Sequence, residues 1–60
     1  MTREEEIEVC IMTLKHRIPI TANALPEYGR ENKTIKSDCE YLIKELQDLI
    51  GYIDELEELN

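Results

Sequence analysis

The sequence predicts an all-α fold, in which an N-terminal helix and a long C-terminal helix form a helical hairpin. Apolar residues recur at intervals of three and four in both halves of the chain, which is the period of a helix with one apolar face. Both prolines and one of the two glycines lie between those halves. A length of 60 residues gives room for one domain, residues 1–60.

The first predicted helix covers residues 3–17. Thr2 and Glu5 have the spacing of a capping box, in which the two residues satisfy free amides at a helix start. Pro19 is predicted to end the helix, because the residue before a proline resists the helical conformation. The apolar face consists of Ile7, Ile11, Leu14 and Ile18.

Residues 19–32 are predicted to form a long, partly ordered connection between the helices. Thr21 is a candidate cap for a separate short helix through Leu25, and a turn is expected at 26–29. A connection of this length is unusual in so small a domain, so it is either partly helical or functional.

The C-terminal segment has the most regular pattern in the chain. Spacings of four and three alternate without interruption, which is a heptad seam that predicts one long helix. Its start is expected at Asn32 or at Ser37, where a second capping box is possible. The seam comprises Ile35, Cys39, Leu42, Leu46, Leu49, Ile53 and Leu56, and Ile43 and Ile50 widen it on one side.

This seam is predicted to be the core of an antiparallel homodimer. A first helix of about 23 Å would be too short to cover a seam of about 33 Å. In a monomeric hairpin the acidic start of the first helix would also lie beside the acidic end of the second. Antiparallel pairing instead places that end near Lys33, Lys36 and Lys44 of the partner. The predicted seam contacts are Leu42, Leu46, Leu49, Ile53 and Leu56.

Composition argues against several functional classes. A net charge of −7 excludes a wholly basic nucleic-acid binder, and no segment has the roughly 18 apolar residues of a membrane span. The acidic N-terminus is unlike a signal peptide, so we expect a cytoplasmic protein, in the host cytoplasm if it is viral. Cys10, Cys39 and His16 lack metal-ligand spacing, and the cysteines are expected to be small buried hydrophobes. We expect no metal, no cofactor and no small-molecule substrate.

An enzyme is not expected, because the chain has one histidine, no phosphate-binding loop and no nucleophile motif. Protein binding is the favoured class. Tyrosines alternate with acids along one helix edge, which is the composition of an interface, although a solvated acidic face is the simpler reading. We therefore expect an inhibitor or regulator of another protein, for example a phage-type inhibitor of a host defence or nucleic-acid-binding factor. The candidate partner-binding residues are Tyr28, Tyr41, Asp48, Tyr52 and Glu55.

Residues 21–42 carry a second pattern, consisting of Thr21-Ala22-x-x-Leu25, then Gly29, then Lys33-Thr34-Ile35-Lys36-x-Asp38-x-x-x-Leu42. This segment resembles the DeoR-type winged helix-turn-helix of bacterial regulators. The resemblance implies a recognition helix capped by Asn32, with Lys33, Thr34 and Lys36 facing DNA. Residues 15–36 sum to +3, and Arg30 belongs to this basic patch. A small DNA-binding regulator is therefore the alternative function.

Overall fold

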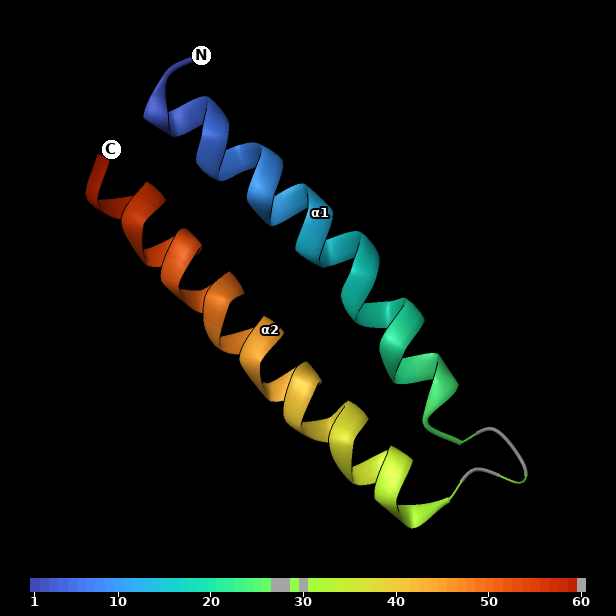
Figure 1. Ribbon diagram of the computed structural model, residues 1–60. Helices are drawn as coiled ribbons and strands as arrows, with labels where there is room; N and C mark the ends of the chain where they lie inside the picture. Colours follow the sequence, from blue (N-terminus) through green and yellow to red (C-terminus); the bar gives the residue numbers. More distant parts are fainter. Residues whose placement is uncertain (27–28, 30, 60) are drawn as a thin grey trace.

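The computed structural model describes residues 1–26, 29 and 31–59, and these form an α-helical hairpin (Figure 1). Helix α1 spans Arg3–Ala24 and helix α2 spans Asn32–Leu59. The two helices run antiparallel and side by side, so the N-terminus of α1 and the C-terminus of α2 lie at the same end. We call this end the open end. The predicted all-α hairpin is confirmed, and the molecule is a rod of 45 × 15 × 14 Å.

Helix α1 begins where the capping box predicts. The backbone N–H of Glu5 donates to Oγ1 of Thr2 at 3.1 Å, and the Thr2 hydroxyl donates to Oε1 of Glu5 at 3.2 Å. Glu4, Glu5 and Glu6 fill the first turn, where the helix dipole favours negative charge. The start of α1 is therefore determined by local sequence.

The predicted end of α1 at residue 17 is wrong, because the helix continues through Pro19 to Ala24. A proline inside a helix removes one hydrogen-bond donor and crowds the preceding turn. The helix nevertheless continues because Ile18, Thr21 and Leu25 are half-buried on the same face as the core residues. Packing against α2 thus outweighs the local cost of the proline. Residues 21–24 are the last turn of α1 rather than a separate short helix.

Helix α2 begins at Asn32, the earlier of the two predicted starts. The connection between the helices is therefore shorter than the predicted range of 19–32. Within it, Gly29 has a φ of +85°, a backbone conformation that residues with a side chain rarely adopt. The predicted turn at 26–29 includes Glu27 and Tyr28, which lie outside the described residues.

The core between the helices is small. Among the described residues, only Ile7 and Leu14 are buried apolar side chains. On α2 the heptad seam divides, since Leu42, Leu49 and Leu56 are half-buried whereas Leu46 and Ile53 are exposed. The buried and half-buried positions between Leu42 and Leu56 also include Glu45 and Tyr52. Helix α1 therefore contacts one edge of the predicted seam and leaves the other edge open.

The longer α1 also changes one argument for a dimer. At 1.5 Å per residue, α1 is about 33 Å long and α2 about 42 Å. Helix α1 therefore extends along most of α2, and the predicted shortage of length does not exist. What α1 leaves uncovered is a side of α2 and not its far end.

We expect Pro19→Ala to raise the free energy of unfolding by about 1–3 kcal/mol, because it restores a helical N–H without removing a buried contact. Pro19 is exposed, so no core packing is lost. Urea denaturation followed by circular dichroism measures the change. His16→Ala, at another exposed position of α1, is the control and should change stability by less. A Pro19→Ala protein no more stable than the wild type would contradict this account of α1.

Candidate interaction surfaces

An aliphatic stripe lies exposed along α2. It consists of Ile43, Leu46, Ile50 and Ile53, whose exposed fractions are 55%, 45%, 59% and 40%. Their spacings of three, four and three place them on one face, where neighbouring side chains lie a single turn apart. The stripe contains Leu46 and Ile53 from the predicted seam and the two isoleucines predicted to widen it.

The edge of α2 that carries the predicted tyrosine and acid residues lies beside α1. At the open end, Arg3 binds Glu55 through two hydrogen bonds, from Nε to Oε2 at 2.6 Å and from Nη2 to Oε1 at 2.9 Å. This contact from the Arg3 guanidinium lowers the pKa of Glu55 and raises that of Arg3. Arg3 also approaches Glu6 at 3.4 Å.

Near the middle of the hairpin, Arg17 holds a second contact across the helices. Its guanidinium donates to the Tyr41 hydroxyl and lies 5.7 Å from the centre of the Tyr41 ring. Its Nε is 3.5 Å from Oε2 of Glu45. Glu45 is 4% exposed, and neither carboxylate oxygen has a hydrogen-bond partner among the described residues. The interface therefore contains a buried carboxylate that is incompletely satisfied.

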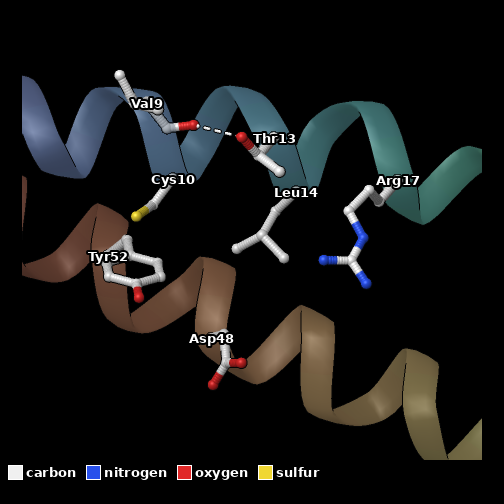
Figure 2. A pocket seen from close by; sticks show the side chains of 7 residues that line it. All are labelled: Val9, Cys10, Thr13, Leu14, Arg17, Asp48 and Tyr52. Carbon is white, nitrogen blue, oxygen red and sulfur yellow. Dashed lines mark hydrogen bonds between the residues drawn. The ribbon is translucent and has the colours of Figure 1, made fainter.

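A shallow groove of about 220 Å³ runs between the helices on this side (Figure 2). The Cys10 sulfur points toward the Tyr52 ring, and hydrogen bonding with Cys10 is the main cause that raises the pKa of Tyr52. Asp48 forms an ion pair with Lys44 one turn earlier, at 3.1 Å. The groove is lined by Val9, Cys10, Thr13, Leu14, Arg17, Asp48 and Tyr52.

These contacts define a single antiparallel register. Arg3 meets Glu55, and fourteen residues later Arg17 meets Tyr41, which lies fourteen residues before Glu55. Such steps are two heptads, so each helix presents one row of side chains to the other. The sequence contains this signal, since Arg3, Cys10 and Arg17 are spaced by seven, as are Tyr41, Asp48 and Glu55. The signal appears only when the two helices are compared, because each row alone is an ordinary heptad spacing.

The predicted partner-binding residues of α2 therefore lie together in the structure. They occupy the edge of α2 that lies beside α1. Tyr41 is 43% exposed and Asp48 is exposed, whereas Tyr52 and Glu55 are half-buried. The predicted contact Tyr28 lies outside the described residues. Arg17 and Glu45 were not predicted to contact each other, and their role depends on the rotation of the two helices.

The residues of the predicted DNA-binding segment occupy the first turns of α2 and the end of α1. Lys33, Thr34 and Lys36 are exposed, and Arg30 lies outside the described residues. In a helix-turn-helix the two helices cross at about 90–120°. Here α1 and α2 lie antiparallel (Figure 1).

The charge of the molecule is concentrated at the open end. Arg3 with four glutamates gives −3 over residues 1–8, and four carboxylates give −4 over residues 54–59. Together these equal the formal net charge of −7, so the rest of the chain is balanced. Arg3 is the single cationic side chain among these residues, which makes its contact with Glu55 the main local compensation between side chains.

Within the described ranges, no three His, Cys, Asp or Glu side chains are placed to hold a metal ion. Neither helix, over those residues, combines the length and the apolar character needed to cross a bilayer. Comparisons with protein-family models, curated proteins and solved structures found no match to this chain.

We expect Glu45→Leu to raise the free energy of unfolding by about 1–2 kcal/mol, because it replaces an unsatisfied carboxylate between Leu42 and Leu49 with an apolar side chain. Glu45→Gln is the matched control, since it keeps polar atoms at the same place and should stabilise less. Urea denaturation measures both variants. A less stable Glu45→Leu protein would show that attraction to Arg17 outweighs the burial of the charge.

We expect the contribution of Glu55 to stability to disappear in acid. Because Arg3 lowers the pKa of Glu55 from its ordinary value of 4.5, the contribution is complete above that value and is lost as the pH falls through the folded-state pKa. The difference in free energy of unfolding between the wild type and Glu55→Gln should therefore shrink below about pH 4.5. Glu58→Gln removes the same charge from the same end of α2 and is the control. A difference that stays constant with pH would contradict the assignment.

Proposed function

We propose that the protein is an acidic helical interaction module without catalytic activity, which self-associates as a homodimer and inhibits or regulates another protein by binding it. The observation that supports this most is the aliphatic stripe, whose four large side chains are 40–59% exposed. A continuous exposed apolar surface is typical of protein-interaction sites.

The small core supports self-association. Single domains below about 70–80 residues rarely obtain enough stability from their own core, and oligomerisation is a common remedy. Covering a half-exposed aliphatic side chain contributes about 1 kcal/mol. Eight such side chains in a dimer contribute about 8 kcal/mol as an upper bound. That amount is large beside the stability expected of a hairpin whose described residues include two buried apolar side chains.

The opposite side of the hairpin is the surface that we assign to the target protein. Tyr41 and Asp48 are accessible there beside the groove between the helices. Tyrosine and carboxylate side chains together suit a partner with basic and apolar residues. Tyr52 and Glu55 support this surface through their contacts with Cys10 and Arg3.

The second candidate function is DNA binding by residues 21–42. The observation that favours it is the exposure of Lys33, Thr34 and Lys36 on the first turns of α2. The antiparallel course of the helices weighs against it, because a helix-turn-helix needs crossed helices that project one of them into a groove. We therefore favour the interaction module.

Light scattering coupled to size exclusion tests the self-association. We expect about twice the chain mass for the wild type and the mass of a single chain for Ile50→Asp, because a charge in the stripe opposes its burial. Ile20→Asp is the matched control, since Ile20 is also 59% exposed but lies on α1. It should leave the dimer intact. Circular dichroism should show that all three proteins are helical.

A helical wild-type protein with the mass of a single chain over a dilution series would contradict the proposed self-association. Equal dissociation by Ile50→Asp and Ile20→Asp would contradict the assignment of the stripe. Binding to DNA fragments at low salt that Lys33→Ala with Lys36→Ala abolishes would support the second candidate instead.

A further inference from the structure

The aliphatic stripe is symmetric along α2. Ile43 and Ile53 lie five residues on either side of Asp48, and Leu46 and Ile50 lie two residues on either side of it. An antiparallel copy centred on Asp48 therefore places Ile43 opposite Ile53 and Leu46 opposite Ile50. Each contact joins two large aliphatic side chains, so this orientation leaves no mismatch in size.

We propose that a second copy of the chain covers the stripe with its own α2, which runs antiparallel. The two α2 helices cross at the level of Asp48, so Cys39 of one copy faces Glu57 of the other. The dimer is then a four-helix bundle. This inference rests on the proposed self-association. It keeps the antiparallel orientation that the sequence predicts and adds the register of the two copies.

Charge determines the orientation. A parallel pair would bring together two open ends that each hold the whole net charge of −7. Repulsion between groups on neighbouring helices acts within the Debye length of about 8 Å at physiological salt. In the antiparallel pair, Glu57 of one copy faces residues 36–44 of the other, in which Lys36 and Lys44 balance Asp38 and Glu40. The acidic end is thereby placed beside the balanced part of the chain.

The positions of Cys39 and Glu57 follow from the same register. Each lies nine residues from Asp48, and their separation of eighteen positions corresponds to five helical turns. Both side chains therefore project from α2 in the same direction, along the middle of the stripe. Cys39 is a free, half-buried cysteine and Glu57 is exposed.

Helix α1 contributes to the same side of the hairpin. Leu56, one turn after Ile53, lines a second shallow groove of about 270 Å³ together with Ile11 and Met12, and Glu8 and Lys15 complete its lining. Met12 is 69% exposed, which is more than any residue of the stripe. Both helices of each copy thus present apolar side chains on this side, which is the arrangement of a four-helix bundle and not of an isolated helix pair.

Disulfide trapping tests the register. Cys10→Ser leaves Cys39 as the single thiol, and Glu57→Cys adds a second thiol at the position that should face it. Under mild oxidation with diamide, we expect a disulfide between chains that joins Cys39 to the new thiol at position 57. Non-reducing electrophoresis gives its yield, and peptide mass mapping identifies the pair. Cysteine Cβ atoms must approach to about 4 Å for this bond to form.

Glu58→Cys in the same background is the matched control, because position 58 points away from the stripe. Its yield should be at least severalfold lower. An equal yield at positions 57 and 58 would overturn the register, and rapid formation of a Cys39–Cys39 dimer in the Cys10→Ser protein would overturn the antiparallel orientation. Failure of the proposed self-association would be recognised separately, because light scattering would then show single chains before any oxidation.

Discussion

Two helices share only one interface, and this limit determines most of what the hairpin exposes. Helix α2 carries apolar side chains over an arc wider than α1 can contact. The row of Arg3, Cys10 and Arg17 on α1 pairs with the row of Tyr41, Asp48 and Glu55 on α2. This pairing fixes the rotation of α2, so Leu42, Leu49 and Leu56 turn toward α1. The remaining apolar arc becomes the aliphatic stripe, because no third element covers it.

The sequence predicts the fold where local rules and packing agree. The cap at Thr2 and the heptad pattern of α2 each depend on residues close in the chain. Both predict a helix, and both helices are present in the structure. Pro19 is where they disagree. Its local effect opposes a helix, but the contacts of Ile18 and Leu25 on the core face extend α1. The spacing of residues within one segment does not give the strength of contacts between distant segments.

The candidate surfaces are less accessible to sequence analysis, because they depend on the rotation of each helix. A heptad pattern identifies an apolar arc but not which edge a neighbour will cover. By spacing, Glu45 falls on the helix edge where tyrosines alternate with acids, yet the residue is 4% exposed at the interface. The sequence signal of that rotation is the heptad spacing of Arg3, Cys10 and Arg17, which matches the row of Tyr41, Asp48 and Glu55 on α2. Self-association and target binding stay predictions, since they involve molecules other than this chain.

The shared location of the two chain ends has a consequence for how the hairpin closes. Contacts between residues beside the connection require the smallest loss of chain entropy, because the loop that they close is short. The pairing of Arg3 with Glu55 joins residues 52 positions apart, so we expect it to form last when the hairpin closes from the connection. The same end bears the self-repulsion of the net charge. We therefore expect this end also to separate first on heating, with fraying that begins at the termini and progresses toward the turn.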